Sequence, residues 1–434
     1  MSRLPPNHSQ RLALADEVHA RPPEALETPS RASCVAVLVA PDQRDAEQAH
    51  LARLCETFGV VPPEAGAIHF VADLGRVRLR WERHGEFSNY TVFTSGRSGV
   101  PFAEPPTSLL PEGWLAAIPG EVIFAGHAKI ITGGPEEPDA AFLAGHFGPA
   151  VVVGSRVGGG AALAFTDFHL HADGYSRFLI LDRSLTPRQA GRTVQRLFEI
   201  ETYRMMAMLA LPVAREQLGR IGAIERDLAA LTGDIAGRTA DDETVLAALT
   251  GLAAEVEKGL AASQFRFGAC VAYQNLVTRR IEELRERRLP GVQTIEEFMG
   301  RRFTPAIATC ASASQRLHGL SERVAQASAL LTTRVEIARE RQNQELLGSM
   351  NRRAILQMRL QQTVEILSVA PITYYVVAIV GYASRALKAA GLPIDPDLTE
   401  GAAIPIVAAL LIVIMVRVHH QVFGKAHDGA DLEM

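Results

Sequence analysis

A seven-residue run in the first half of the chain, DFHLHAD, carries the side chains best suited to chemistry. Its polar members alternate with apolar ones and are Asp167, His169, His171 and Asp173. On a β-strand, successive side chains point to opposite faces, so this alternation predicts all four polar groups on one face. Imidazole and carboxylate together suit a divalent transition metal, which makes the run a candidate metal site. The alternative is a half-exposed strand whose polar face meets only water, as is common in antiparallel sheets.

The rest of the sequence gives little support for catalysis. The glycine-rich run GSRVGGGAA, residues 154–162, lacks both the dinucleotide fingerprint and the lysine of a phosphate-binding loop, which favours a tight turn between strands. No serine or cysteine lies in a recognisable nucleophile elbow, so we expect no enzyme and no cofactor beyond the possible divalent cation. The four cysteines lack metal-site spacing, which predicts buried thiols in a reducing cytosol. The net charge of -4 predicts no nucleic-acid partner.

The elements that would position the DFHLHAD run belong to an α/β domain. Between residues 34 and 182, short segments rich in Val, Ile, Phe and Tyr alternate with Gly and Pro, which predicts strands. Residues 76–83 and 88–94 are predicted to form a hairpin, and the segment AEQAHLARLCETFG has helical spacing. We therefore predict a mixed sheet within a cytosolic domain of residues 1–185.

From Thr186 onward the apolar period changes from two residues to about 3.6, which predicts helices. Ser184 or Thr186 caps the first of these helices, and Pro212 stops or kinks it. Further helices are predicted over 214–231, over 244–289 and from about residue 305 onward. The predicted divisions are a helical middle domain, a long stalk helix, a transmembrane hairpin and a cytosolic tail, over residues 186–300, 301–363, 364–418 and 419–434.

The stalk helix carries a heptad pattern of small and apolar residues. One position of the repeat is occupied by Cys310, Leu317, Val324, Leu331 and Ala338, and the other by Ala313, Leu320 and Ala327. This is the seam of a coiled coil. Either the seam packs against the predicted 244–289 helix of the same chain, or it packs against copies of itself in a homo-oligomeric stalk.

Two apolar runs near the C-terminus, VEILSVAPITYYVVAIVGY and AAIPIVAALLIVIMVRV, flank the polar loop SRALKAAGLPIDPDLTE. Each run approaches the ~20 apolar residues that a helix needs to cross a bilayer. Residues 364–418 are therefore predicted to form a transmembrane hairpin, with the lipid bilayer as a partner.

The orientation of that hairpin follows from its flanking cations. Arginines and a lysine outside the two runs are Arg352, Arg353, Arg359, Arg417 and Lys425, whereas the intervening loop combines two cations with three acids. Because Lys and Arg resist translocation, both termini are predicted to be cytoplasmic. The N-terminal residues contain no apolar segment typical of a signal peptide, so the hairpin is expected to be the targeting signal.

Three segments carry a family resemblance. They are ADEVHARPPEALETP, FTDFHLHADGYSRFLILDRSLTPRQAGRTVQRLFEIETYRMMAMLALP and LLGSMNRRAILQMRLQQTVEILSVAPITYYVVAIVGY. Together they resemble a bacterial family of uncharacterised membrane-anchored proteins, a domain of unknown function, over essentially the whole chain. The resemblance implies a place in the bacterial inner membrane and leaves the chemistry open.

The order of elements is also similar to the CorA class of divalent-cation channels, which are homopentamers whose first transmembrane helix lines the pore. In that class the first crossing ends in Gly-Met-Asn, and the Asn helps select hydrated magnesium. The matching residues here are Gly381, Tyr382 and Ala383. The resemblance therefore implies a homo-oligomer, a pentamer if it holds, with altered or lost magnesium selectivity.

If the stalk is oligomeric, extending its two seams into the membrane predicts the pore-lining residues Gln362, Ile366, Val369 and Thr373. The predicted external mouth comprises Gly381, Tyr382, Asp395, Asp397 and Glu400. Two functions then compete. The protein is either a CorA-like cation channel or transporter, or a membrane-anchored scaffold or sensor that binds a partner through its cytosolic domains without transporting anything.

Overall fold

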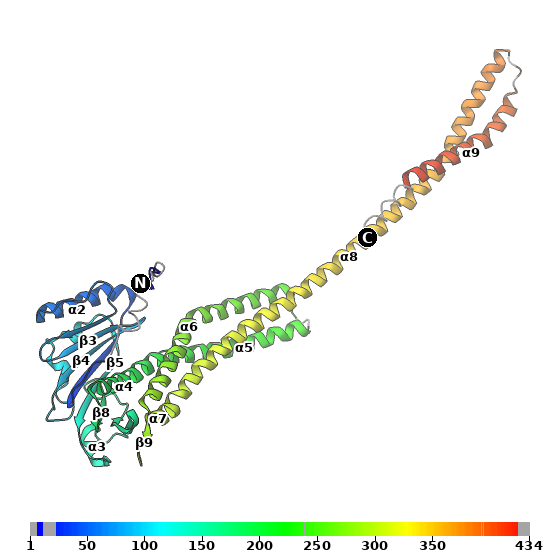
Figure 1. The fold of residues 1–434 in the computed structure, drawn as a ribbon. Helices are drawn as coiled ribbons and strands as arrows, with labels where there is room; N and C mark the ends of the chain where they lie inside the picture. The colour runs from blue at the N-terminus through cyan, green and yellow to red at the C-terminus, as the bar shows by residue number, and fades with distance from the viewer. Residues whose placement is uncertain (1–6, 12–22, 238–239, 392, 394, 424–434) are drawn as a thin grey trace, which may run out of the picture. The chain divides into compact units, whose positions relative to one another are not determined.

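The computed structural model describes residues 7–11, 23–237, 240–391, 393 and 395–423, with side chains as far as Arg417. The chain divides into two compact units, residues 1–329 and 330–434. The first unit contains a mixed sheet and several helices, as the sequence predicts, and the second contains long helical segments (Figure 1).

In the described part of the first unit, nine strands form one sheet in the order β2-β3-β4-β1-β5-β8-β7-β6-β9. Their bounds are Ser30–Leu38 (β1), His69–Asp73 (β2), Arg78–Arg83 (β3), Phe87–Ser95 (β4), Glu121–Thr132 (β5), Val153–Val157 (β6), Ala162–Thr166 (β7), Ser176–Asp182 (β8) and Arg287–Arg288 (β9). The β5–β8 pair is parallel and the other pairs are antiparallel, so the predicted mixed sheet is confirmed. The predicted hairpin is the β3–β4 pair.

One face of the sheet is covered by helix α2, Arg44–Phe58, where the sequence has helical spacing. Glu47 on this helix is fully buried, and its carboxylate accepts hydrogen bonds of 3.0 Å from both the Trp81 indole and the Tyr90 hydroxyl. Arg44 and Arg83 compensate its charge at 3.4 and 3.8 Å. A buried carboxylate is tolerated only with such partners, so this cluster fixes α2 on the sheet.

The opposite face is covered by helix α4, Pro187–Met208. Thr186 and Gln189 form a capping box at its start, which confirms the predicted cap. Phe198 packs between Phe124 of β5 and Phe178 of β8, with ring centroids 6.1 and 5.6 Å away. The Phe198 contacts anchor the middle of α4 on the sheet and thereby set the position of every other side chain on this helix.

The remaining helices of the first unit are α3 (Ala140–Phe147), α5 (Ala210–Gly237), α6 (Asp242–Leu284), α7 (Ile295–Arg302) and the start of α8 (Thr304–Ala389). Of these, α5, α6 and α8 follow the predicted order with corrected ends, whereas α3 and α7 were not predicted. The break between α4 and α5 lies just before Pro212, as predicted. Helix α6 ends five residues earlier than predicted, because Arg285 adopts a left-handed conformation (φ 51°) and Arg287–Arg288 pair with β6 as β9.

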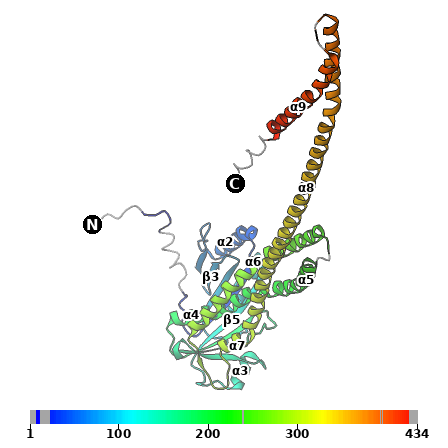
Figure 2. The same cartoon turned by 90° about the vertical axis from the view of Figure 1, so that its right-hand side faces the viewer.

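The first part of the heptad seam of α8 is buried against other helices of the same chain. Its members from Cys310 to Ala327 are all buried. Helices α5, α6 and α8 lie side by side in both ribbon views (Figures 1 and 2), and Arg316 of α8 pairs with Glu225 of α5 at 2.6 Å. Gly259 of α6 leaves room for Leu317, which would lie only 3.4 Å from a side-chain carbon at that position. In this segment the seam therefore packs against helices of the same chain. Ala338, farther along the pattern, is exposed.

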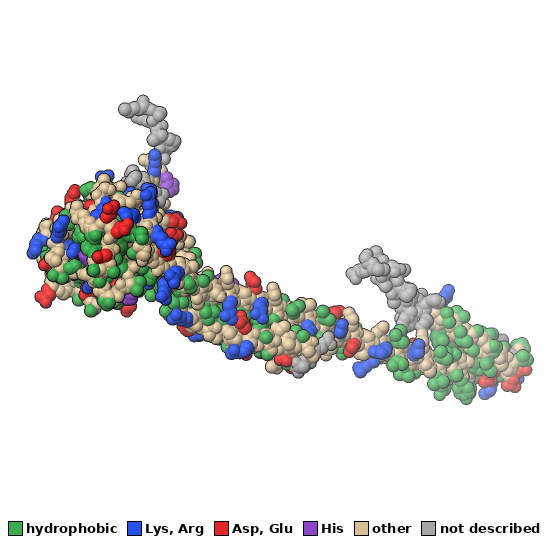
Figure 3. Space-filling view, turned by 90° about the horizontal axis from the view of Figure 1, so that it is seen from below, with side chains coloured by type: hydrophobic (Ala, Val, Ile, Leu, Met, Phe, Trp, Pro, Cys, Tyr) green, Lys and Arg blue, Asp and Glu red, His purple; other side chains and the backbone are tan. Residues whose placement is uncertain are grey.

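The second unit consists of the rest of α8 and α9, Pro396–Phe423. Each helix is long and apolar enough to cross a membrane by length and composition. Apolar side chains cover much of its surface (Figure 3), including Ile366, Leu367 and Tyr374 at more than 60% exposure. Helix α8 continues to Ala389, so the first part of the predicted polar loop is helical instead.

Candidate functional site

The DFHLHAD run does not form the strand that the sequence predicts. Strand β7 ends at Thr166, and residues 167–175 form a loop. The reason is Phe168, whose backbone has a φ of 52° and whose ring stacks on Phe298 of α7 at 4.5 Å. A left-handed residue cannot continue an extended strand, so the alternation of the sequence is not converted into one polar face.

The four polar residues of this loop satisfy one another and their neighbours. Asp167 is buried and its Oδ2 lies 2.9 Å from His171 Nε2, while His169 Nδ1 lies 2.8 Å from the Asp167 carbonyl oxygen. Asp173 accepts a hydrogen bond from the Tyr175 amide and lies 3.7 Å from Arg177. Within the described ranges, no group of three or more His, Cys, Asp or Glu side chains could hold a metal ion. The loop is a folded turn held by local bonds.

The glycine-rich run is a tight turn, as expected. Gly158–Gly160 form a short 3-10 turn between β6 and β7, and all three glycines have positive φ. This backbone conformation disfavours any other residue.

The structure places the predicted pore-lining residues on α8 of the second unit. Gln362 and Ile366 are exposed, whereas Val369 and Thr373 are half-buried. The Thr373 hydroxyl donates to the Val369 carbonyl oxygen at 2.7 Å, so it is engaged within its own helix.

Of the predicted external mouth, the structure brings Gly381 and Glu400 together. A Cβ at Gly381 would lie 2.7 Å from Glu400 Oε1, so a larger residue at this position would require the Glu400 side chain to shift. Arg385, which the sequence analysis did not single out, pairs with Glu400 at 3.2 Å, and its guanidinium lies 5.9 Å from the exposed Tyr382 ring. Asp395 and Asp397 stand instead at the start of α9, where the Asp395 carboxylate accepts the Asp397 amide.

A different site lies between α4, α6 and the edge strand β2. A cavity of about 720 Å³ is found there. Its lining residues are Pro23, Glu24, Ala25, His69, Val71, Arg188, Arg192, Gln195, Arg196, Glu199, Arg280 and Glu283. Three of its arginines occupy successive turns of α4, and a fourth comes from α6. Cavities of this size hold small organic molecules or cofactors.

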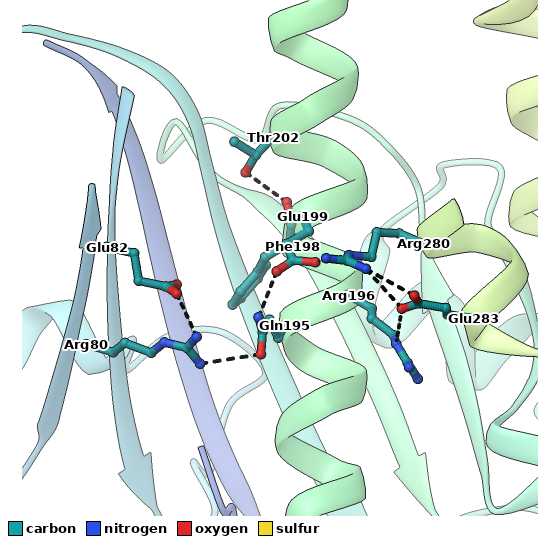
Figure 4. Close-up of polar contacts among 9 residues, drawn as sticks. All are labelled: Arg80, Glu82, Gln195, Arg196, Phe198, Glu199, Thr202, Arg280 and Glu283. Carbon is teal, nitrogen blue, oxygen red and sulfur yellow. Dashed lines mark hydrogen bonds and ion pairs between the residues drawn. The ribbon is translucent and has the colours of Figure 1, made fainter. Parts of the chain in front are cut away.

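On the sheet side, the cavity adjoins a buried polar chain (Figure 4). Arg80 of β3 pairs with Glu82 at 2.7 Å and reaches Gln195 of α4 at 3.4 Å. Gln195 in turn donates to Glu199 at 2.7 Å. Arg80 and Glu82 are only 3% and 7% exposed, so the chain carries charge through the interior between the sheet and α4.

On the helix side, Glu199 continues the chain to α6. Its carboxylate pairs with Arg280, and Arg280 also reaches Glu283 at 3.1 Å. Glu283 accepts a further bond of 3.0 Å from Arg196 of α4. The sheet, α4 and α6 are thus joined by one series of charge-assisted hydrogen bonds, which are stronger and more directional than neutral ones.

Burial governs the acid–base properties here. Desolvation raises the pKa of Glu199, and the neighbouring Arg280 guanidinium opposes that rise. Burial also raises the pKa of the Cys34 thiol to about 12, so this thiol stays protonated and unreactive. All four cysteines are free and buried, in agreement with the expectation for buried thiols.

Two cations of the cavity are not compensated by any described residue. Arg188 and Arg192 are exposed, and neither makes an ion pair with any residue in the described part of the chain. Nearby, Arg80 Nε and Asn89 Oδ1 are buried without a hydrogen-bond partner among the described residues. Both border a small void next to the cavity that Gln195 and Glu199 also line.

Comparison with known families decides the relationship of this chain. Residues 6–422 match the family described as "Protein of unknown function (DUF3422)". The chain belongs to this family. The resemblance to a domain of unknown function over nearly the whole chain is therefore confirmed, whereas the CorA resemblance stays a prediction. No curated protein matches the chain.

One part of the cavity could have been found from this family member's sequence. The helix over TPRQAGRTVQR was predicted, and arginines at 188, 192 and 196 must share one helical face. The other part could not, because Arg80 and Glu82 read as ordinary strand residues until the sheet is known to face α4.

Proposed function

We propose that this DUF3422 protein is a membrane-anchored sensor or scaffold. The arginine-lined cavity of residues 1–329 binds a ligand, and α8 and α9 hold the chain in a bilayer. One observation carries the proposal. Side chains that line the cavity also belong to the series of hydrogen bonds and ion pairs that runs from β3 through α4 to α6. All four cysteine thiols are free and buried, which favours binding over thiol-based catalysis.

A ligand in such a cavity has a direct route to the helical part of the unit. Any group that competes for Arg196 or Arg280 weakens a bond between α4 and α6. Helix α6 packs on α8, so a shift of α6 changes the packing of that helix as well. A ligand can bias a conformation only through different contacts in its two states, and these ion pairs supply such a difference.

The membrane part of the proposal is supported by the apolar second unit. Residues 364–389 and 396–417 are predominantly apolar and largely exposed, and exposed apolar surface of this extent suits a bilayer. The cations Arg352, Arg353 and Arg359 precede the first segment and Arg417 ends the second. By the positive-inside rule, we propose that both ends face the cytoplasm, at the bacterial inner membrane.

A homo-oligomer is also part of the proposal. Before the membrane segment, α8 exposes a set of large apolar side chains, which are Leu346, Leu347, Met350, Leu356 and Leu360 at 56–67% exposure. Residues 346–360 contain three arginines and no acid, so the segment is more polar than the membrane segment that follows it. A second copy of the same helix would cover these side chains.

Native mass spectrometry of the full-length protein in detergent, after incubation with a deproteinised cell extract, tests the ligand. We expect a small-molecule adduct on the wild type that Val71→Trp abolishes, because Val71 lines the cavity and the larger indole would obstruct it, while tryptophan keeps strand propensity. Val122→Trp, on an exposed strand position outside the cavity, is the matched control. An adduct that persists in Val71→Trp, or none in the wild type, contradicts the proposal.

A second candidate is the CorA-like channel with altered or lost magnesium selectivity. The observation in its favour is that Gln362 and Ile366 are exposed on α8, as residues facing an oligomer axis would be in a single chain. The same mass measurement tests it, because a monomer or dimer has too few helices to enclose a pore. If a larger oligomer is found, cation flux in liposomes and its loss in Thr373→Leu decide between the candidates.

A further inference from the structure

We propose that the cavity between α4, α6 and β2 binds a small molecule that carries a phosphate group, and that Arg188 and Arg192 are the residues that grip this phosphate. This inference rests on the proposed function and names the ligand class. The four arginines of the cavity outnumber its three carboxylates, and one of those, Glu24, is shared with Arg78 outside it at 2.7 Å.

Arg188 and Arg192, which make no ion pair with a described residue, are arranged so that both can bind one anion. Arg188 and Arg192 are four residues apart on α4, so their Cβ atoms are separated by about 5–6 Å on one face. Both guanidinium groups can then present their paired N–H donors to one tetrahedral anion. Arginine is suited to this role because its fork matches phosphate geometry bidentately.

Without a bound anion, the positive charges of Arg188 and Arg192 destabilise helix α4. Like charges four residues apart destabilise a helix by a few tenths of a kcal/mol in the absence of a counter-ion. Arg188 also lies in the first turn of α4, next to the positive end of the helix dipole, where cations are unfavourable. Helix α4 has no acidic residue in this turn to offset the charge. A bound anion removes both penalties at once.

The other arginines in and beside the cavity already have carboxylate or amide partners. Arg196 and Arg280 are bonded to Glu283 and Glu199, and the Arg80 guanidinium is held by Glu82 and Gln195. These pairs hold α4 in position against the sheet and α6. The phosphate is therefore assigned to Arg188 and Arg192 rather than to the buried arginines.

The remainder of the cavity fits the body of such a molecule. About 720 Å³ greatly exceeds the size of a bare phosphate. Pro23, Ala25 and Val71 offer an apolar wall, and the Gln195 amide offers hydrogen bonds. The ligand is thus an organic phosphate ester with both apolar and hydrogen-bonding parts.

Calorimetric titration of the full-length protein in detergent with inorganic phosphate, at low ionic strength and at a pH where phosphate is dianionic, tests the grip. Arg188→Gln/Arg192→Gln is expected to weaken phosphate binding by at least about tenfold, because the loss of each guanidinium group removes charge-assisted hydrogen bonds. The matched control is Arg215→Gln/Arg226→Gln, which removes two exposed arginines of α5 outside the cavity and is expected to leave the affinity within about twofold. Equal affinities in the two double variants overturn the inference.

A second arm identifies the source of the phosphate. Glycerol 3-phosphate represents a soluble ester, and nanodiscs of phosphatidylglycerol against phosphatidylcholine represent a lipid headgroup. Binding of glycerol 3-phosphate that Arg188→Gln/Arg192→Gln weakens supports the inference, whereas binding confined to phosphatidylglycerol overturns the small-molecule assignment. If the Val71-dependent adduct persists in the double variant and phosphate does not bind, the phosphate class fails while the sensor proposal stands.

Discussion

Two polar clusters of the first unit differ in what they leave free. The loop of residues 167–175 closes on itself, since Asp167 holds His171 and the backbone of His169 within a few residues. The α4 cavity joins groups that are far apart in sequence, such as Arg80 with Gln195 and Glu199 with Arg280. It also retains two arginines that the described residues do not compensate. A cluster that satisfies itself supports a fold, whereas a cluster with surplus charge beside a cavity can receive a ligand.

The largest test of this contrast is the buried ion pair under the cavity. Glu82→Leu leaves the Arg80 charge buried without its carboxylate, so we expect a loss of about 3–5 kcal/mol in the free energy of unfolding. Arg80→Met/Glu82→Leu removes both charges and is expected to recover much of that loss. Denaturant unfolding of the full-length protein in detergent measures both. If Glu82→Leu is as stable as the wild type, the Arg80–Glu82 pair does not stabilise the fold.

The next effect concerns His127, which lies beside the loop cluster and stacks on Tyr175 at 3.8 Å. Burial lowers the pKa of His127 from 6.5 to about 4. The unfolded chain therefore binds more protons between these values, and stability falls as pH is lowered through that window. The expected contribution is on the order of 3 kcal/mol.

Stability curves measured at several pH values check this expectation. His127→Gln cannot titrate in the window, so its stability should change less between pH 6.5 and about 4 than that of the wild type. Parallel pH profiles for the two proteins contradict the assignment.

A smaller effect is expected in the loop itself. Asp167→Ala removes the acceptor for His171 Nε2 and the His169 amide, and leaving such groups unpaired costs about 1–3 kcal/mol. Because the loop is held by protein bonds, added Zn²⁺ or Mn²⁺ should not raise the melting temperature of the wild type. Stabilisation by either metal that Asp167→Ala abolishes shows that the loop is a metal site after all.

The smallest effect on stability is expected at the proposed grip. Arg192→Gln removes one of two exposed like charges on α4, so the free energy of unfolding should stay within about 0.5 kcal/mol of the wild type or rise slightly. A thermal melt of the full-length protein measures this. A clear loss of stability gives Arg192 a structural role and removes the contrast between the two clusters.

Features that depend on local periodicity can be predicted from the sequence alone. The β3–β4 hairpin, the capped α4 with its break before Pro212, the glycine turn at 158–160 and the two apolar segments all follow from spacing within a few residues. The sequence also carried the family relationship, because that likeness extends over residues 6–422.

The positions and partners of the polar side chains, in contrast, depend on tertiary packing. The alternation of DFHLHAD has the period of a strand, but packing of Phe168 on Phe298, 130 residues later, turns the chain at that point. The heptad seam fits an oligomer and an intramolecular pair equally well, and the burial of Leu317 against Gly259 selects the second for that segment. The cavity requires β3, α4 and α6 to meet, and no pattern along one segment specifies the partner across a sheet. Periodicity fixes which face of an element is polar, while the charge that remains free depends on what packs against that face.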